Sequence, residues 1–292
     1  MNGKVYCEGV VAGTDGNEEY LVHCCDLAQD VWITLPQLPV REFSLGQVNN
    51  QLVAVGGLKK SQSVMATNKV YTYDERSKEW KQTIPPMPTA RHSPGVLSLQ
   101  SALVVAGGDP GLFHTDVVEV FRPETSQWYR TDPLPTKCRC MSLIAADNIC
   151  YVLGGFKSPT ILNQVVYASV DDLLYNAVPA NQNTHSGGSS DTQSAWKTLP
   201  NTPTFLYGQV AATLADNLLT IGGEESGEGE GNKKEIYMYC PTSNQWMHIS
   251  DLPVPRSRAT VAILSPAEVL VIGGFGDDNM KAVYRGTLSM QL

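Results

Sequence analysis

The fold of this chain is decided by residues 91–128, RHSPGVLSLQSALVVAGGDPGLFHTDVVEVFRPETSQW. Three short apolar segments, 95–99, 102–106 and 117–121, alternate with polar turns, and the doublet Gly107-Gly108 closes the second segment. Apolar segments of this length, bounded by Gly, Pro, Asn and Asp, are typical of antiparallel strands and are too short for helices. A fourth segment around Trp128 follows another polar turn, so the stretch predicts one sheet of four strands, named a, b, c and d in chain order.

This unit recurs along the chain with a regular period. Successive tryptophans at 32, 80 and 128 are about 48 residues apart, a period that is typical of propellers and repeat arrays. The Gly-Gly doublets that close strand b are Gly56-Gly57, Gly107-Gly108, Gly154-Gly155, Gly222-Gly223 and Gly273-Gly274. The tryptophans that mark strand d are Trp32, Trp80, Trp128, Trp196 and Trp246.

Three features in fixed order resemble the kelch repeat: the doublet after strand b, an aromatic residue in strand c (Tyr73, Phe121 and Tyr239) and the tryptophan in strand d. The resemblance covers nearly all 292 residues and implies an all-β, six-bladed kelch β-propeller of four-stranded antiparallel blades. We expect a single domain, 1–292, with approximate repeats 1–40, 41–88, 89–136, 137–202, 203–254 and 255–292. The terminal blades are incomplete: the first lacks strand a and has Gly9-Val10 in place of the doublet, and the last ends after a c-like segment, 281–285.

The repeated residues have structural explanations. A Gly-Gly doublet lets the backbone adopt positive φ and lets neighbouring blades approach closely. Tryptophans are large apolar anchors between adjacent sheets. We therefore assign the ten doublet glycines and the five tryptophans to the framework, and not to phosphate or substrate binding.

Composition restricts the classes of partner. The formal net charge of -8 and the isoelectric point near 5.1 oppose nonspecific binding to nucleic acid or to anionic membranes. No apolar run approaches the length of a membrane span, and residues 1–7 lack the core of a signal peptide. Seven cysteines, an odd number that includes the vicinal pair Cys24-Cys25, favour reduced thiols over a disulfide framework. We expect a cytoplasmic domain that is monomeric and binds neither nucleic acid nor membrane.

No motif predicts catalysis, a metal or a cofactor. The histidines have no spacing of metal ligands, and no serine lies in a nucleophile elbow. Cys138-Arg139-Cys140 is at most half of a metal site, because no second Cys or His pair lies at ligand spacing. The glycine-rich segment 222–231 carries four glutamates, which would repel a phosphate, and is expected to be a mobile acidic loop. The two histidines expected to be neighbours at the top of one blade are His92 and His114.

One face of the predicted ring collects residues with a pattern. In four-stranded antiparallel blades, the b–c loops and the d–a connections emerge on the same side. Just ahead of strand a, four connections carry arginine: Arg41, Arg91, Arg139, and Arg256 with Arg258. Aromatic residues and one histidine are interleaved with them: Phe156, Tyr207, Phe275 and His92. Arginine can bind carboxylates through two hydrogen bonds, so this pattern predicts a surface for an acidic or turn-forming peptide. The alternative is that these arginines bridge adjacent blades.

The pattern also resembles the peptide-binding face of kelch-like substrate adaptors, in which arginines before strand a engage acidic peptides. By this resemblance Arg91 matches best, and Arg41 and Arg139 match more loosely. It implies a non-catalytic protein-interaction scaffold, and a ubiquitin-ligase adaptor role only for a protein with further BTB and BACK domains. The alternative is a kelch-fold enzyme or carbohydrate binder, similar to sialic acid mutarotase or galactose oxidase. The copper ligands and the Tyr–Cys pair of galactose oxidase cannot be assembled from the sequence.

The opposite face has one irregular connection. From Val170 to Trp196 the c–d segment is about nineteen residues longer than its counterparts, and its composition at 181–190 is typical of a loop. Residues 172–175 could extend the strand or form one helical turn, and the segment could form a second contact surface.

Overall fold

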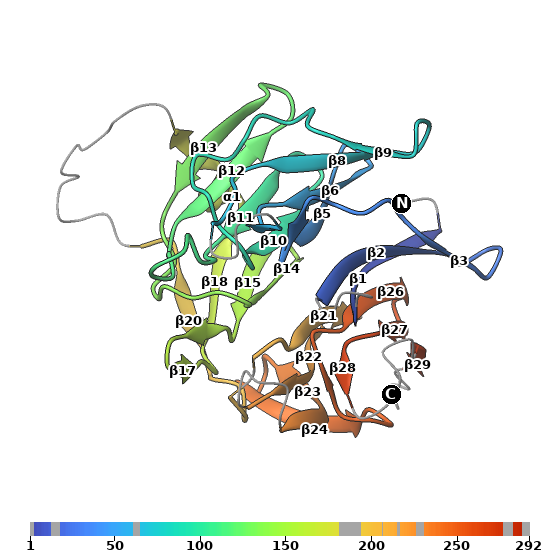
Figure 1. Ribbon diagram of the computed structural model, residues 1–292. Coiled ribbons are helices and arrows are strands. Elements are labelled where there is room, and N and C mark those ends of the chain that lie inside the picture. The colour runs from blue at the N-terminus through green and yellow to red at the C-terminus, as the bar shows by residue number, and fades with distance from the viewer. Residues whose placement is uncertain are drawn as a thin grey trace.

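Six sheets are arranged around a ring in the computed structural model (Figure 1). The structure describes residues 3–12, 18–60, 65–180, 194–205, 207–214, 217–225, 231–276 and 283–287. Each sheet is antiparallel and is built mainly from strands that are consecutive in the chain. The six-bladed, all-β architecture predicted from the sequence is therefore confirmed.

The first half of the ring comprises blades 1 to 3. Blade 1 contains β1 (Lys4–Ala12), β2 (Glu18–Asp26) and β3 (Val31–Thr34). Blade 2 contains β5 (Ser44–Val48), β6 (Gln51–Val55), β8 (Val70–Asp74) and β9 (Glu79–Lys81). Blade 3 contains β10 (Gly95–Ser98), β11 (Leu103–Ala106), β12 (Val118–Arg122), β13 (Gln127–Thr131) and β19 (Val178–Pro179).

The second half of the ring follows the same plan. Blade 4 contains β14 (Ser142–Ala146), β15 (Ile149–Leu153), β18 (Val165–Ser169) and β20 (Lys197–Leu199). Blade 5 contains β21 (Val210–Leu214), β22 (Asn217–Glu224), β23 (Asn232–Cys240) and β24 (Gln245–Asp251). Blade 6 contains β26 (Thr260–Ser265), β27 (Glu268–Ile272) and β29 (Val283–Thr287). Two-residue strands form three further pairs: β4 (Val40–Arg41) with β7 (Leu58–Lys59), β16 (Phe156–Lys157) with β17 (Thr160–Ile161), and β25 (Arg256–Ser257) with β28 (Phe275–Gly276).

The core lies between neighbouring blades. Val53 and Val55 of β6 pack in one cluster with Leu103 and Val105 of β11, and all four side chains are buried. Both faces of the middle strands are covered, because each blade has a neighbour on either side. The sequences of the middle strands are therefore continuously apolar and do not alternate between apolar and polar residues.

Four of the five tryptophans join adjacent blades through the indole N–H. Each donates a hydrogen bond to a backbone carbonyl at the end of the preceding blade: Trp80 to Pro36 at 2.7 Å, Trp128 to Pro85 at 2.8 Å, Trp196 to Asp132 at 3.1 Å and Trp246 to Pro200 at 2.9 Å. Trp32 differs, since it is 42% exposed. In the described part of the chain, blade 6 has no fourth strand against which Trp32 could pack.

The glycine doublets have the conformation that their role requires. Gly56 has a φ of 68°, and a Cβ atom there would lie 2.3 Å from the carbonyl oxygen of Arg91 in the next blade. Gly222 is equivalent, with a φ of 57° and a distance of 2.3 Å to the carbonyl oxygen of Arg256. A side chain at either position would force two blades apart.

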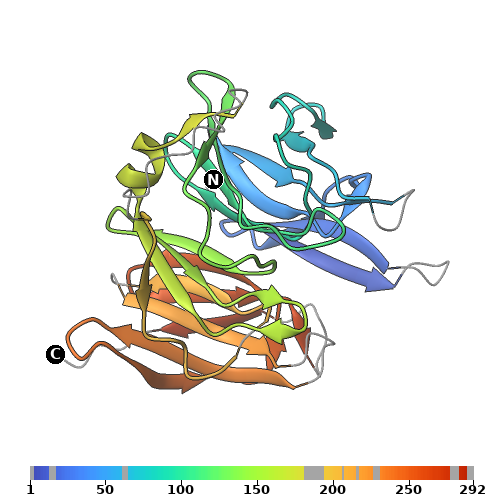
Figure 2. The ribbon, with the colours of Figure 1, turned by 90° about the vertical axis from the view of Figure 1, so that its left-hand side faces the viewer.

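Two segments differ from the four-stranded plan. The long connection after β18 begins with helix α1 (Val170–Tyr175), which is the coiled yellow-green ribbon in Figure 2, so the helical alternative for residues 172–175 is the correct one. The chain then adds β19 to the outer edge of blade 3, opposite Tyr129 and Arg130. In blade 5 the doublet lies inside β22, which continues to Glu224, so part of the expected acidic loop is strand. Residues 181–193 and 226–230 of these two predicted loops lie outside the described residues.

The terminal blades are incomplete, as the sequence predicts, and each contains three described strands. Among the described residues, blade 1 has no innermost strand a and blade 6 has no outermost strand d. The two blades nevertheless meet, because Cys7 of β1 packs with Leu270 and Ile272 of β27. Figure 1 shows β1 and β2 between β26 of blade 6 and the strands of blade 2.

Candidate functional site

One pairing recurs at the mouth of the central channel. In blades 2 to 6, the residue that follows the glycine doublet pairs with a residue of the d–a connection. The pairs are Arg41 with Leu58, His92 with Asp109, Arg139 with Phe156, Tyr207 with Glu224, and Ser257 with Phe275. Backbone pairing thus places the d–a residues and the b–c residues on one face, as the sequence predicts.

The next residue of each connection turns toward the channel. Glu42, Ser93, Cys140 and Arg258 have φ values of 53°, 48°, 55° and 53°, and Gly208 occupies the same position in blade 5. Backbone hydrogen bonds join them from blade to blade: Ser93 N–H to the Glu42 carbonyl at 2.9 Å, Cys140 to Ser93 at 3.0 Å and Arg258 to Gly208 at 2.6 Å. This inner ring holds its side chains at fixed positions around the channel.

Cationic and aromatic side chains form a continuous row on one side of the mouth. The guanidinium carbon of Arg139 lies 5.5 Å from the centroid of the Phe156 ring, and the Phe156 and Tyr207 rings are 5.7 Å apart. The guanidinium carbon of Arg258 lies 4.8 Å from the Tyr207 ring and 5.1 Å from the Phe275 ring. The structure therefore brings together five of the residues singled out in the sequence.

Two glutamates balance part of this positive charge. The Glu42 carboxylate lies 2.8 Å from Arg41 Nη1, 2.9 Å from His92 Nδ1 and 3.9 Å from Arg139 Nη1. Burial raises the pKa of Glu42, but the hydrogen bond and charge of His92 and the charges of Arg41 and Arg139 outweigh this effect, so its pKa lies below the usual value. Glu224 is buried and lies 2.9 Å from Arg258 Nη2.

Of the three channel-mouth arginines Arg41, Arg139 and Arg258, Arg139 has the longest contact with a carboxylate. Its distance to Glu42 is 3.9 Å, too long for a hydrogen bond, and its Nε is buried without a hydrogen-bond partner. Its side chain remains 24% exposed. A guanidinium with free donors beside aromatic rings is suited to bind an incoming carboxylate.

Arg91 and Arg256 lie elsewhere, which corrects the expectation that they contact a partner. They precede the paired residues His92 and Ser257 by one position, and successive side chains of an extended chain point to opposite sides. Arg91 is 0% exposed and Arg256 is 1% exposed. Arg91 Nη2 lies 2.7 Å from the buried Glu119 carboxylate, and its Nη1 donates to two backbone carbonyls at 2.8 Å.

Arg256 has a comparable interior position. It donates hydrogen bonds to the backbone carbonyl of Gly273 and, at 2.8 Å, to the hydroxyl of Tyr284, over whose ring it also lies at 4.5 Å. Arg91 and Arg256 are therefore buried framework residues. The side-chain contacts described here lie within their own blades and do not support the alternative of a bridge between adjacent blades.

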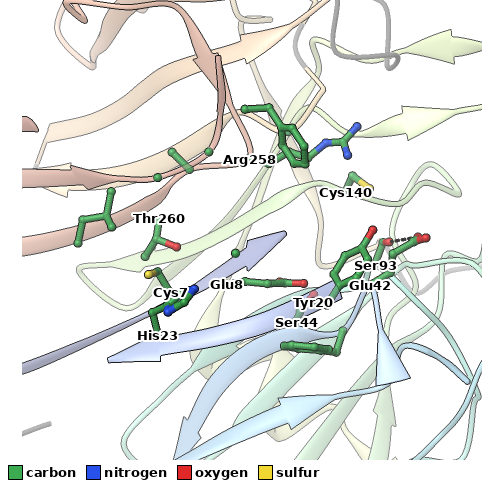
Figure 3. Close-up of a pocket in the computed structure, with 18 of the residues that line it drawn as sticks. Cys7, Glu8, Tyr20, His23, Glu42, Ser44, Ser93, Cys140, Arg258 and Thr260 are labelled. Atoms are coloured by element: carbon green, nitrogen blue, oxygen red, sulfur yellow. Dashed lines mark hydrogen bonds between the residues drawn. The ribbon is translucent and has the colours of Figure 1, made fainter. Parts of the chain in front are cut away.

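A cavity of about 1000 Å³ opens at the centre of this face (Figure 3). Its wall includes Glu42, Ser93, Arg139, Cys140, Tyr207 and Arg258 from the channel mouth. Blade 1 contributes a second set of lining residues, which the sequence did not single out: Cys7, Glu8, Tyr20 and His23. The cavity is wide enough to take side chains of a partner in addition to surface contacts.

The histidines and cysteines at the mouth form no metal centre. His114 Nδ1 lies 3.1 Å from Asp109 Oδ2, and His92 Nε2 lies 3.9 Å from the same oxygen. Cys140 Sγ lies 3.3 Å from the Tyr207 hydroxyl, and burial raises the pKa of both groups. In the described part of the chain, no group of three or more His, Cys, Asp and Glu side chains is placed to hold a metal ion. All seven cysteines are free thiols.

Sequence reasoning missed Glu42 and Glu8. Glu42 follows Arg41 directly and occupies the inner-ring position, so alignment of the repeats on their doublets could have found it. Glu8 was hidden because the doublet of its repeat is altered to Gly9-Val10.

Comparison with known proteins agrees with the fold. No protein-family model matches the chain. Kelch-like protein 40 of Xenopus laevis is 25% identical over 248 residues, which cover 82% of this chain and 36% of that protein. Kelch-like protein 15 of Homo sapiens is 25% identical over 259 residues, which cover 84% of this chain and 40% of that protein. The chain thus spans less than half the length of these relatives.

A solved structure, that of YjhT, has a TM-score of 0.73 and 15% sequence identity, and the match covers 97% of this chain and 90% of that chain. At this identity the likeness shows the fold alone. Together with the repeat pattern and the kelch-like relatives, it shows that this chain is a kelch-repeat β-propeller. No described helix is long and apolar enough to cross a membrane.

Proposed function

We propose that this kelch-repeat propeller is a non-catalytic protein-interaction module that binds a carboxylate-bearing peptide at the channel mouth. The kelch-like relatives support a protein partner, and the row of Arg139, Phe156, Tyr207, Arg258 and Phe275 supports the chemistry of that partner. Rigid aromatic rings provide contact area at low entropic cost, and guanidinium groups orient carboxylates. Arg41 and His92 lie at the edge of this surface and hold Glu42.

The proposal rests mainly on the position of Arg139. This residue lies at the mouth of the large cavity, and its Nε is buried and has no hydrogen-bond partner. Arg41 and Arg258 each have a carboxylate within 2.9 Å, whereas the contact of Arg139 with Glu42 is 3.9 Å. A carboxylate of a partner can therefore bond to Arg139 without first displacing a short ion pair. We expect Arg139 to contribute more to affinity than its neighbours.

The test is a fluorescence anisotropy titration with a labelled, capped peptide, Glu-Ser-Asn-Gly-Ser-Glu, which places carboxylates on both sides of an Asn-Gly turn. Arg139→Ala should weaken binding by roughly 1 to 3 kcal/mol, the usual range for a charge-assisted hydrogen bond. Affinity should also fall as salt rises, because partly exposed charges are screened.

The matched control is Arg285→Ala. Arg285 is an exposed arginine that pairs with Glu268 at 2.7 Å, next to the a–b turn of blade 6 on the opposite face. Equal losses in Arg139→Ala and Arg285→Ala would mean that the peptide binds by net charge alone. Absence of binding, together with a rise in melting temperature on adding a sugar, would favour the carbohydrate-binding or enzymatic alternative.

A role as the substrate-recognition part of a ubiquitin ligase, a cytoplasmic location and a monomeric state are further parts of this proposal. The ligase role rests on the resemblance to kelch-like proteins, of which the chain matches 36% and 40% of the length in the two relatives described above. Binding of a cullin by a protein that contains this propeller together with the implied BTB and BACK domains would support it, and binding of substrates without any cullin would contradict it.

A further inference from the structure

The b–c loop of blade 3 carries an exposed apolar pair at the channel-mouth face. This loop connects β11 to β12, and its residues Leu112 and Phe113 are 89% and 80% exposed. Among the described large hydrophobic residues, only Tyr175 is as exposed. Single apolar side chains are common on protein surfaces, whereas adjacent ones that project together into solvent mark a surface for interaction.

The pair belongs to blade 3 and not to the repeat. Leu112 and Phe113 are the fourth and fifth residues after the doublet Gly107-Gly108. At the same two positions the other repeats with a doublet carry no large apolar residue: Ser61-Gln62, Pro159-Thr160, Gly227-Glu228 and Asp278-Asn279. The framework of the propeller therefore does not require apolar side chains at this place.

The base of the loop is fixed beside the channel mouth. Asp109 and His92 exchange two backbone hydrogen bonds of 2.9 Å, and Thr115 N–H donates to the Gly108 carbonyl at 3.0 Å. Within the loop, Gly111 N–H donates to Asp109 Oδ1 at 2.7 Å. A loop that is held in this way loses less conformational freedom when a partner binds to its tip.

Ring contacts join the apolar pair to the cationic and aromatic row. His114 directly follows Phe113, and its ring lies 5.6 Å from the ring of Phe156. The guanidinium carbon of Arg139 lies 5.5 Å from the same Phe156 ring. Burial lowers the pKa of His114, so its ring is neutral near pH 7 and continues the apolar contact. The exposed pair and Arg139 are thus parts of one surface.

The charges beside the pair favour an acidic partner. The Asp109 carboxylate is directed into its own loop, where Oδ1 accepts from Gly111 and Oδ2 lies 3.1 Å from His114 Nδ1. On the side of the row, Arg139 and the exposed Lys157 are cationic. An apolar centre with a charged rim is the composition of a protein-binding surface.

We propose that Leu112 and Phe113 bind an aliphatic side chain of the same peptide whose carboxylate binds Arg139. Alternate residues of an extended peptide lie on one side, about 6.5 Å apart for two positions and about 13 Å for four. Only two ring contacts separate His114 from Arg139, so the aliphatic residue lies two or four positions from the acidic one. This inference rests on the proposed function, because it names a second residue of the peptide that is proposed there.

The experiment compares two labelled, capped peptides by fluorescence anisotropy. The first, Leu-Ser-Leu-Ser-Glu-Ser-Asn-Gly-Ser-Glu-Ser-Leu-Ser-Leu, adds aliphatic residues at these spacings on both sides of the acidic peptide described above. The second has Ser in place of every Leu. We expect the wild type to bind the Leu peptide at least tenfold more tightly than the Ser peptide, because aromatic and aliphatic contacts at the centre of an interface dominate affinity.

The double variant Leu112→Ser, Phe113→Ser should bind both peptides with the affinity that the wild type has for the Ser peptide. The matched control is Tyr175→Ser, which removes a side chain that is 90% exposed on α1 and should keep the tenfold preference. Melting temperatures of all variants should stay within a few degrees of wild type, since the side chains are exposed.

Four results would overturn the inference: no binding of the Leu peptide at millimolar concentration, equal affinity of the wild type for both peptides, a preference for the Leu peptide that persists in the double variant, or the same loss of preference in Tyr175→Ser. Failure of the proposed function has a different signature. In that case Arg139→Ala would bind both peptides as the wild type does, while the preference for the Leu peptide would still depend on Leu112 and Phe113.

Discussion

At the residue scale, a shift of one position along the chain separates arginines that reach the surface of the channel mouth from arginines that are buried. Arg139 pairs with Phe156 through its backbone and points to the surface, while Arg91 lies one residue earlier than its paired neighbour and points into the blade. The buried guanidinium is held by Glu119, which is also buried and also contacts Arg130. The ion pair of Arg91 and Glu119 is therefore structural, and each of the two buried charges is stabilised by the other.

We predict that Glu119→Ala destabilises the propeller by about 3 to 5 kcal/mol, because it leaves Arg91 buried without its counter-charge. Urea unfolding measures the effect. Glu124→Ala, which removes an exposed glutamate from the same blade, is the control and should change stability by less than about 0.5 kcal/mol. Similar midpoints for the two variants would show that the buried pair contributes little.

Glu8 should make stability depend on pH. Its pKa is about 8 in the folded protein and near 4.5 when exposed, so between these values the folded state holds a proton that the unfolded state has lost. Stability from this group is therefore complete below about pH 4.5 and is lost as pH rises through 8. At about 1.36 kcal/mol per pKa unit, Glu8→Gln should gain about 2 kcal/mol or more relative to wild type between pH 5 and pH 9. Urea unfolding at both pH values tests this, and parallel pH profiles of the two proteins would refute it.

The sequence alone could not show which arginines of the channel mouth reach the surface and which are buried. Arg41, Arg91, Arg139 and Arg256 all lie just before strand a, but side-chain direction in an extended chain reverses with each residue. Only the backbone pairing with the residue after the doublet fixes that direction. The sequence could therefore place the connections on one face of the ring, but it could not show that Arg91 is buried.

At the element scale, the long connection between β18 and β20 of blade 4 also packs against blade 3. Leu173 of α1 is buried, and Arg122 of blade 3 donates a hydrogen bond to the Leu174 carbonyl. Strand β19 then extends the sheet of blade 3, and Ala195 N–H returns to the Asp132 carboxylate at 2.9 Å. Composition predicts a loop at 181–190, which lies outside the described residues. Composition could not predict the contacts of the flanking residues with blade 3, because they depend on the tertiary structure.

We predict that the two parts of this connection differ in their effect on stability. Replacing residues 181–193 with a six-residue Gly/Ser linker should change the free energy of unfolding by less than about 1 kcal/mol, since loop length acts logarithmically. Replacing 171–193 should cost at least about 2 kcal/mol, because it also removes the buried Leu173. Urea unfolding of both variants measures the two changes in the free energy of unfolding. Equal effects of the two deletions would show that residues 171–180 do not stabilise the contact with blade 3.

At the scale of the whole molecule, the ring closes through packing between blade 1 and blade 6 and not through a shared sheet among the described strands. The overall fold was predictable because the doublet and the tryptophan each recur in five of the six repeats. Four of the five tryptophans contact the preceding blade in the same way. The open junction was predictable only as a deficit of strands. The exposure of Trp32 could not be predicted, because it depends on which strands of blade 6 the structure describes.

The far-UV circular dichroism spectrum should be dominated by β-structure. Helix α1 has six residues, against 292 in the chain, so the helical signal should be negligible. A helical content above about a fifth, closer to that of ordinary globular domains, would contradict the propeller.

The proposed role of the channel mouth is tested most directly by measuring binding and stability on the same two variants, Arg139→Ala and Arg91→Ala. With the acidic peptide described above, Arg139→Ala should lose at least about tenfold in affinity and keep a melting temperature within a degree or two of wild type, because its side chain lies at the surface. Arg91→Ala should lower the melting temperature by several degrees and, at a temperature where it is folded, bind the peptide as wild type does. The opposite pattern, with affinity lost in Arg91→Ala and stability lost in Arg139→Ala, would contradict the proposed binding surface.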